Sequence, residues 1–467
     1  MKKESPSSAY DVADYLTVHR ITQESDPLSR FCSIFNQLLQ LFPRVDFQHA
    51  VVATQAERHA RGFACWDQFV AMLFCHLGRA HSLREICGGL ASCAGKLAHL
   101  GVAAPGRSTL AYANAHRPWQ LYEQVFYQLL ARCRAVAGPR KFRFKNKLLS
   151  LDATMIDLCA EVFPWATYKR TKGAVKLHFT LDHDGYLPTA LVITEGTRHE
   201  AALARRQAFA PGTILVVDRG YLDYAWFATL TRAGVFFVTR LKVDAAYEVV
   251  ERRAVPQTGG ILADERIALV TYQTVAKYGR DLPLRRVEVV LTDGARLTFL
   301  TNHLGLGPTT IARIYKDRWQ IELFFKALKQ HLRVKTFVGT SANALHIQIW
   351  TALIALLMLK YLQLKASFGW SLSNLVALLR MNLFVYRDLW TWLNDPFTPP
   401  PCRQSPRRRS YRSRNLDSIV RCRLPSAPRR SIFQRDLRSF DGGSCLIRTA
   451  VVVNPRDEPR PPSVTHN

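Results

Sequence analysis

The apolar positions of this chain follow one period in its first third and another beyond it. From residue 34 to about residue 136, apolar side chains recur every three to four positions, which is the period of an amphipathic helix. The strongest run, 66–77, places Trp66, Phe69 and Leu73 on one face. After residue 148 the apolar residues gather in short runs that are typical of strands. We therefore expect a helical region followed by an α/β region.

Two shorter helices are expected within the helical region, one beginning at Ser82 and one at Ser108. Ser82 and Glu85 fit a capping box, and Ser108 is a candidate cap for the second helix. Three basic residues lie at the ends of that second helix: Arg107, His116 and Arg117. Short helices joined by tight turns suit a helix-turn-helix that contacts DNA, and an ordinary helical bundle is the alternative.

Beyond residue 148, strands and helices are predicted to alternate. Strands are expected at 148–158, 175–181, 187–193, 213–217 and 235–239, and helices at 201–209 and 222–233. The sequence His183-Asp184-Gly185 predicts a hairpin between the second and third strands. Three strands in a meander followed by alternating helix and strand is the order of a ribonuclease H-like mixed sheet, so the fold class is α/β.

The rest of the chain contains a second group of short β-like runs and then two long helical ones. The β-like runs lie at 247–250, 267–274, 286–291 and 297–300, and helices that cover the sheet are expected at 344–364 and 372–383. The most apolar run, 347–359, contains Gln348 and Thr351 and is shorter than the roughly 18 residues that a membrane span needs. It predicts a buried helix, with no membrane partner.

These patterns divide the chain into six segments. They are an extension expected to be flexible (1–31), a helical region with the candidate DNA-contacting helices (32–138), the first part of the α/β region (139–240), a β-rich insertion (241–298), the second part of the α/β region (299–400) and a basic tail expected to be disordered (401–467). The tail holds 15 arginines, 5 acidic residues and no lysine, which suits either a nucleic-acid-binding tail or a shifted reading frame.

Composition narrows the class of partner. The net charge is +28, from 64 basic and 36 acidic residues, and such a surplus indicates a polyanion, most simply nucleic acid. The ten cysteines form no CxxC pair, which argues against a zinc site and suits a reducing compartment. No apolar core follows the first lysines, so no signal peptide is expected and we predict a protein of the bacterial cytoplasm, associated with the nucleoid.

Two aspartates stand where apolar strands are expected. Asp152 lies within a strand, and a carboxylate there is costly to bury unless it is paired or binds a cation. Asp218 follows the apolar run 214–217, at the carboxyl end where sites open in α/β sheets. The inferred sheet order makes the two strands neighbours. Other carboxylates compete as ligands but fall in turns or at strand ends: Asp157, Asp182, Asp184, Glu195 and Glu200.

A helix predicted over 315–329 supplies a third carboxylate. At about 100° per residue, Tyr315, Arg318, Glu322 and Lys329 fall within an arc of roughly 60°. An apolar stripe lies beside them: Ile314, Ile321, Phe325, Leu328 and Leu332. A solvated charged flank is one interpretation. The other is that Asp152, Asp218 and Glu322 together bind two Mg²⁺ ions, for which Mn²⁺ can substitute.

The motifs resemble those of DDE transposases of the insertion-sequence-four type. The shared features are the 152–154 and 218–221 strand ends and the signature Tyr-x2-Arg-x3-Glu-x6-Lys at positions 315 to 329. The resemblance implies that Asp152, Asp218 and Glu322 bind the metals and that Tyr315, Arg318 and Lys329 grip phosphates. It implies cut-and-paste transposition at terminal inverted repeats of double-stranded DNA, through a hairpin, by a homodimer in a synaptic complex. A catalytically decayed DNA-binding remnant and a nuclease without strand transfer are the alternatives.

One departure from the family concerns base stacking. Some relatives place a tryptophan in the insertion to stack on a flipped base, and residues 241–302 contain none. Phe299 and Tyr272 are candidate substitutes. Basic residues that follow the strands of Asp152 and Asp218 are further candidates for phosphate contacts: Arg170, Lys172, Lys176 and Arg219.

Overall fold

The computed structural model describes residues 32–397, apart from 59, 138–141, 160, 170–171, 197–199, 258, 271–281 and 332–336. The expectations for the extension at 1–31 and the tail at 401–467 lie outside this range. The described residues belong to one compact unit, Met1–Pro401.

The chain begins with helices, as the apolar period predicts. They are α1 (Ile34–Gln40), α2 (Arg44–Thr54), α3 (Cys65–Leu77), α4 (Leu83–Ser92), α5 (Ala94–Leu97), α6 (Arg107–His116) and α7 (Gln120–Ala135). The cap of α4 follows the prediction, since Ser82 Oγ accepts a hydrogen bond from the Glu85 amide at 3.2 Å. The cap predicted for α6 is wrong: the helix starts at Arg107 after Gly106, so Ser108 is already inside its first turn.

The described strands form one ten-stranded sheet. The first six are β1 (Leu148–Cys159), β2 (Thr167–Lys169), β3 (Lys172–Asp182), β4 (Leu187–Glu195), β5 (Ile214–Val217) and β6 (Phe236–Arg240). β4, β3 and β1 pair antiparallel, and β1, β5 and β6 pair parallel. This is the ribonuclease H-like order that the sequence predicts. The helix expected at 201–209 is shorter, α8 (Glu200–Ala204), and the next helix is α9 (Tyr224–Arg232).

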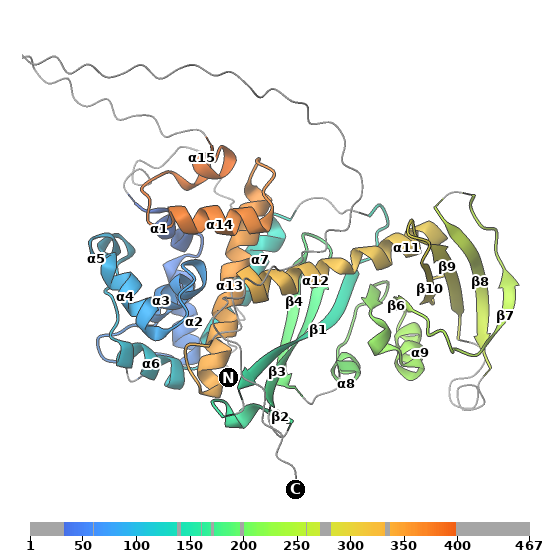
Figure 1. The fold of residues 1–467 in the computed structure, drawn as a ribbon, viewed down its shortest axis with the longest axis horizontal. Coiled ribbons are helices and arrows are strands. Elements are labelled where there is room, and N and C mark those ends of the chain that lie inside the picture. The colour runs from blue at the N-terminus through green and yellow to red at the C-terminus, as the bar shows by residue number, and fades with distance from the viewer. Residues whose placement is uncertain are drawn as a thin grey trace, which may run out of the picture. The chain divides into compact units, whose positions relative to one another are not determined.

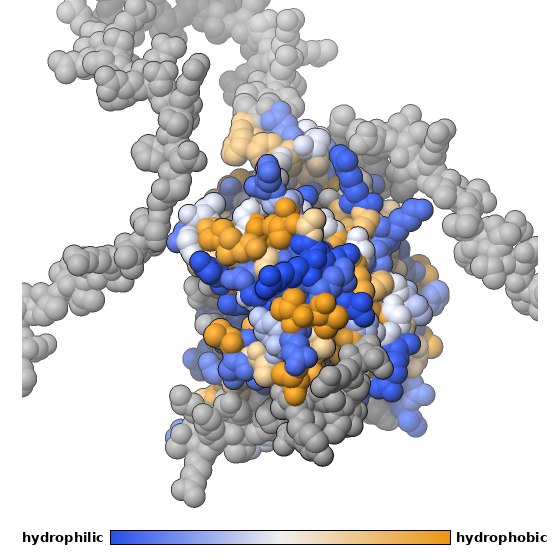
Figure 2. Space-filling view, turned by 90° about the vertical axis from the view of Figure 1, so that its right-hand side faces the viewer, coloured by the Kyte–Doolittle hydropathy of each residue, from blue (hydrophilic) through white to orange (hydrophobic). Residues whose placement is uncertain are grey.

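The β-rich segment extends the same sheet. β7 (Tyr247–Arg252), β8 (Ile261–Leu269), β9 (Leu284–Val290) and β10 (Arg296–Thr301) follow one another as antiparallel neighbours, and β10 pairs with β6. β7 is the edge strand, and hydrophilic side chains cross the face on its side of the molecule between hydrophobic groups (Figure 2). Charged residues along an edge, such as Glu248, Glu251 and Arg252, discourage further strand pairing.

The helix predicted over 315–329 is divided in three. α11 (Pro308–Asp317) and α12 (Trp319–Lys326) run nearly end to end across the sheet (Figure 1), and Ala327–His331 forms a π-helical turn. The predicted apolar stripe is buried at Ile314, Ile321, Phe325 and Leu328, while Leu332 lies outside the described residues. The π turn changes the rotation per residue, so Lys329 departs from the arc that an ideal helix predicts.

The last helices join the two regions of the core. α13 (Ala342–Lys365) packs against α3, α6 and α7, and α14 (Leu372–Asn382) and α15 (Leu389–Asn394) follow it. α12 and α7 contact the sheet, and the apolar side chains of α13 share one buried cluster with those of β1 and β3. By length and hydropathy, 1.7, α13 could cross a membrane, but 83% of its most apolar window is buried inside the protein. Protein on all sides accounts for its uniform apolarity (Figure 1).

Candidate active site

The parallel pairing of β1 and β5 sets the first two carboxylates side by side. Leu151 is the register partner of Val217, and Asp152 and Asp218 are the next residue on each strand. Both side chains are half-buried. Because side chains alternate along a strand, the two carboxylates project to the same side of the sheet. That side is the one on which α11 and α12 pack.

The junction of α11 and α12 brings three more side chains to these aspartates. The Tyr315 hydroxyl donates to Asp218 Oδ1 at 3.3 Å. Arg318 Nη1 donates to Asp152 Oδ2 at 3.1 Å and, at 3.5 Å, to Glu322 Oε1, one turn further along the helix. The structure therefore gathers Asp152, Asp218 and Glu322 around one tyrosine and one arginine.

Negatively charged groups outnumber the Arg318 guanidinium in this cluster. Burial would by itself lower the pKa of the Arg318 guanidinium, but Tyr315 and then the three carboxylates outweigh it and raise that pKa. Burial, assisted by the neighbouring Asp218, raises the pKa of Tyr315 to about 12, so its hydroxyl stays protonated and can donate. Three carboxylates thus share one guanidinium, and Arg318 Nε is buried with no hydrogen-bond partner.

The donor set suits hard divalent cations. Carboxylate oxygens are the ligands that Mg²⁺ prefers, and the cluster already accepts a positive charge at its centre. Within the described residues, no group of three or more His, Cys, Asp or Glu side chains is close enough to hold a metal ion. The Arg318 guanidinium hydrogen-bonds to both Asp152 and Glu322, so these carboxylates could converge on metal only if Arg318 changed partners.

The remaining predicted phosphate contacts differ in where they lie. Arg219 is exposed directly after Asp218, and Lys329 is half-buried in the π turn that follows α12. Lys176 pairs with Met155, an odd number of residues from Asp152, so it lies on the opposite face of the sheet and does not join the cluster. Lys172 begins β3 opposite Cys159. Arg170 lies outside the described residues.

The competing carboxylates have other roles. Asp182 and Asp184 both pair with Lys147 Nζ, at 2.6 and 3.0 Å. Asp157 is exposed on the face opposite Asp152, and Glu195 ends β4. Glu200 is the first residue of α8.

Of the two candidates for base stacking, Phe299 lies among the described residues, and it is buried. Phe299 is 2% exposed and packs on the Tyr315 ring, with ring centroids 4.9 Å apart. Its role is to fix Tyr315 against β10. Tyr272 lies outside the described residues.

Not all the basic residues at the ends of α6, the predicted DNA-contacting helix, are exposed to solvent. Arg107 is exposed at the start of α6. Arg117 turns inward, where Nη1 donates to the Ala64 carbonyl at 2.9 Å and to Gln68 Oε1 at 3.2 Å. It ties α6 to α3 and is not available to a phosphate through those atoms.

Three residues near the site had no distinguishing sequence signal. Ser150, His183 and Asp317 form a buried hydrogen-bonded chain beneath Arg318. Sequence analysis assigns His183 only to a turn and gives Asp317 no role. No local pattern indicates that residues 33 and 134 positions apart meet.

Comparisons with known proteins relate this chain to transposases. The family "Transposase DDE domain" matches residues 143–358, and a domain of unknown function, DUF4372, matches residues 32–103. A transposase of Sinorhizobium fredii, y4zB, is 32% identical over 307 residues, 65% of this chain and 83% of that protein. A transposase for insertion sequence element IS5377 of Geobacillus stearothermophilus is 28% identical over 257 residues, 55% of this chain and 67% of that protein.

Two further similarities are more distant. A transposase for insertion sequence element IS4SA of Synechocystis is 24% identical over 295 residues, 62% of this chain and 81% of that protein. Among solved structures, the piggyBac transposase synaptic complex with hairpin DNA has a TM-score of 0.41 and 10% identity, over 81% of this chain and 84% of that one. The resemblance inferred from the signature at 315–329 is confirmed, and the chain belongs to the DDE transposases of insertion sequences.

Proposed function

We propose that this transposase cuts and joins DNA with divalent cations held by Asp152, Asp218 and Glu322. The observation that supports this assignment most directly is the placement of Arg318. Its guanidinium hydrogen-bonds to two of the carboxylates, and its pKa is raised by all three. A cluster of three carboxylates attracts positive charge.

Each side chain has a distinct role in the proposed reaction. Bound cations would activate the attacking oxygen and stabilise the leaving oxygen of a phosphodiester. Tyr315 keeps its proton at neutral pH and orients Asp218, and Arg318 can exchange its carboxylates for a phosphate, because a guanidinium binds both in the same planar manner. Lys329 and the exposed Arg219 would hold the flanking backbone.

Two successive displacements at phosphorus account for cutting and joining. In the first, the oxygen of water forms a bond to the phosphorus at the transposon end while the bond to the 3′ oxygen breaks, and that oxygen takes up a proton. In the second, the freed 3′ hydroxyl loses its proton and bonds to a new phosphorus, while the 3′ oxygen of the strand it attacks leaves. Attack on the opposite strand would give a hairpin. A repeat of the first displacement, by water at the hairpin phosphorus, would restore the 3′ hydroxyl, and a repeat of the second, on target DNA, would complete insertion.

The direct test is cleavage by the purified full chain. The substrate is linear DNA carrying the inverted repeats that flank its gene, with Mg²⁺ or Mn²⁺. Glu322→Gln, Asp152→Asn and Asp218→Asn should each lower the nicking rate by about 10³-fold or more while DNA binding is retained. Asp157→Asn is the matched control, because this carboxylate lies on the same strand but projects from the opposite face.

The products separate the proposal from its two alternatives. Nicking followed by joining supports transposition. Nicking without joining indicates a nuclease, and DNA binding without nicking indicates a decayed enzyme. Nicking that survives Glu322→Gln would remove this residue from the metal site. In each case DNA affinity should fall steeply with salt, because a chain of charge +28 binds mainly through phosphates.

A further inference from the structure

A buried chain of hydrogen bonds connects the strand that carries Asp152 with the helix junction that carries Arg318. Ser150, two residues before Asp152 on β1, lies 2.6 Å from His183 Nε2 through its Oγ. His183 Nδ1 lies 2.7 Å from Asp317 Oδ2. Asp317 is the last residue of α11 and immediately precedes Arg318.

This chain has the order of a serine hydrolase triad but cannot act as one. Ser150 is 0% exposed, and His183 and Asp317 are each 4% exposed. Their side chains alone are 2% and 3% exposed. No substrate carbonyl can reach the serine oxygen. The three residues therefore act on the arrangement of the protein itself.

The partners fix the direction of the hydrogen bonds. A carboxylate only accepts, so His183 Nδ1 must carry a proton and donate it to Asp317. In the neutral imidazole, Nε2 then accepts from the Ser150 hydroxyl. Hydrogen bonds to a charged group are the stronger kind, and burial excludes competing water.

The turn between β3 and β4 is built to hold His183 in this place. Lys147 pairs with Asp182 and Asp184 on either side of it, and the His183 amide donates to the Leu148 carbonyl at 3.1 Å. Tyr186 closes the turn with φ of 54°, a left-handed conformation that a non-glycine residue rarely adopts. Its hydroxyl donates to the same Asp317 carboxylate, at 3.2 Å to Oδ2.

We infer that Ser150, His183, Tyr186 and Asp317 are positioning residues for the active site, a set we call the relay. The relay fixes the α11–α12 junction, with Arg318 and Glu322, against the strand that bears Asp152. It touches neither DNA nor metal. Its assignment to catalysis rests on the proposed function, whereas its effect on the geometry of the junction does not.

The physical basis is the short covalent distance from each end of the relay to a site residue. Ser150 and Asp152 lie on the same face of β1 because they are two residues apart. Asp317 is adjacent in sequence to Arg318 and lies five residues before Glu322. A shift of the junction by an ångström would separate Glu322 from Asp152, and partners that orient metal ligands typically change metal affinity or activity about 10–100-fold when lost.

The test uses the full chain and Mn²⁺ alone as the probe. Ser150→Ala removes only a hydroxyl, and His183→Gln keeps a polar side chain of similar length. Both should weaken Mn²⁺ binding, followed by electron paramagnetic resonance of the free ion, by about 10-fold or more. The rate of Mg²⁺-dependent nicking should fall in parallel, and affinity for DNA without metal should stay unchanged.

His76→Gln is the matched control. His76 is also buried, at 1% exposure, and bonds a hydroxyl, Thr351 Oγ1, at 3.0 Å, but it lies between α3 and α13. A change there should lower thermal stability at least as much as Ser150→Ala does and leave Mn²⁺ binding unaltered. This comparison separates a positioning effect from general loss of stability.

A second readout keeps the relay testable whether or not the wild-type chain cleaves DNA. Amide hydrogen exchange in residues 315–326 should become faster in Ser150→Ala and His183→Gln but not in His76→Gln. Unchanged exchange and unchanged Mn²⁺ binding in both relay variants would overturn the inference. A wild-type chain that neither binds Mn²⁺ nor nicks DNA, but shows the exchange difference, would refute the proposed function and leave the relay standing.

Discussion

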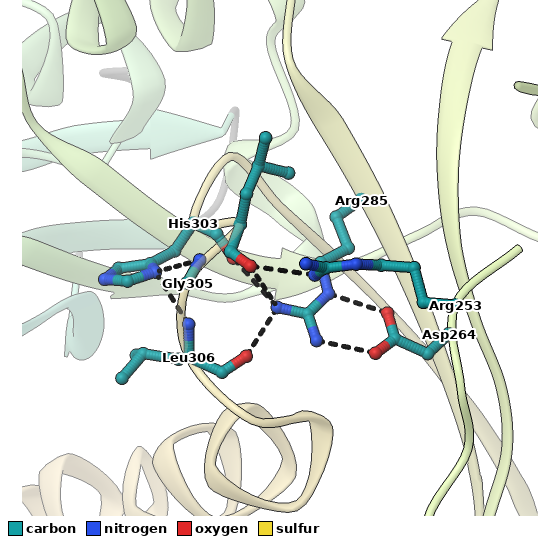
Figure 3. Close-up of polar contacts among 7 residues, drawn as sticks. Arg253, Asp264, Arg285, His303, Gly305 and Leu306 are labelled. Carbon is teal, nitrogen blue, oxygen red and sulfur yellow. Dashed lines mark hydrogen bonds and ion pairs between the residues drawn. The ribbon is translucent and has the colours of Figure 1, made fainter. Parts of the chain in front are cut away.

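Arg285 and Arg318 both bind carboxylates, and they differ in how completely their hydrogen bonds are satisfied. Arg285 on β9 is 1% exposed at its side chain and faces Asp264 on β8, which is 3% exposed. Arg285 Nε and Nη2 each donate to one Asp264 oxygen at 2.7 Å. Nη1 donates to three backbone carbonyls, those of His303, Leu304 and Leu306 (Figure 3).

Arg318 has the opposite character. One nitrogen, Nη1, serves both Asp152 and Glu322, the bond to Glu322 is long at 3.5 Å, and Nε has no partner. The Glu322 side chain is 37% exposed. Arg285 pairs with one carboxylate, Asp264, whereas Arg318 pairs with two, Asp152 and Glu322, and also feels the charge of Asp218.

The difference separates an arginine that holds the fold from one that is available to a ligand. Arg285 fixes the loop 303–306 that leads into α11, so that loop cannot move without leaving a buried charge unpaired. Arg318 can leave its partners at lower cost, because water or a cation can replace it beside the exposed Glu322. The following changes test this contrast, from the largest expected effect to the smallest.

Arg285→Met should give the largest loss of stability. It leaves Asp264 buried without its counter-charge, and breaking such a pair costs about 3–5 kcal/mol in the free energy of unfolding. Urea denaturation measures the loss. Arg296→Met is the control: this arginine pairs with Glu288 at 3.9 Å and is 72% exposed, so the change should cost within about 1 kcal/mol. A loss at Arg285 no larger than that at Arg296 would contradict the comparison.

Removal of a carboxyl charge should change the free energy of unfolding in opposite directions beside Arg285 and beside Arg318. Asp264→Asn should lower the free energy of unfolding by about 1–3 kcal/mol, since an amide cannot accept both Arg285 hydrogen bonds. Glu322→Gln, measured without divalent ions, should leave it unchanged or raise it by about 0.5–2 kcal/mol, because one of three like charges is removed at a site built for function. Destabilisation of both variants would show that the Glu322 charge also serves the fold.

Divalent ions should compensate for the loss of one arginine and not the other. Arg318→Gln removes the counter-ion of Asp152 and Glu322 and should lower stability by about 1 kcal/mol in chelator. Thermal unfolding should show that Mg²⁺ restores this loss, since an ion that binds only the folded state stabilises it. Mg²⁺ should not restore Arg285→Met. Equal responses of the two variants would remove the distinction between them.

The smallest effect concerns His303, in the Arg285 cluster. Burial, and then the Arg285 charge, lowers the pKa of His303, and its Nδ1 accepts hydrogen bonds from the Gly305 and Leu306 amides at 3.2 Å each. The ring is therefore neutral when folded. A lowered folded pKa gives stability that is present above the ordinary value of 6.5 and lost as pH falls below it. His303→Asn, whose Oδ1 can accept the same amides, should flatten that dependence in thermal unfolding at a series of pH values.

Sequence pattern predicts those parts of this molecule that depend on neighbours along the chain. The strand order from 148 to 240 follows from apolar runs and the 183–185 turn, because a tight turn forces adjacent strands to pair. Asp152, Asp218 and Glu322 were predictable because each breaks or flanks an apolar run. The signature spacing at 315–329 then relates Glu322 to Tyr315 and Arg318.

What the sequence does not reveal depends on contacts between distant residues. The pairing of β10 with β6 and the buried Arg285–Asp264 pair leave no local pattern. Lys176 and Arg117 were plausible phosphate contacts by charge. Strand alternation places Lys176 on the face of the sheet opposite Asp152, and Arg117 donates a hydrogen bond to the Ala64 carbonyl. The division of the 315–329 helix at Arg318 and its π turn is set by packing, since propensity favours an unbroken helix there.

The position of α13 restricts which gene segments related insertion sequences can exchange. This helix, which follows the sheet in the chain, completes the interior of the helices that precede the sheet. Exchange of the amino-terminal module between related elements would therefore expose or overfill the α13 surface, unless the distal coding segment recombined with it. The two gene segments are expected to be inherited together, and hybrids that swap only one of them should accumulate as insoluble protein.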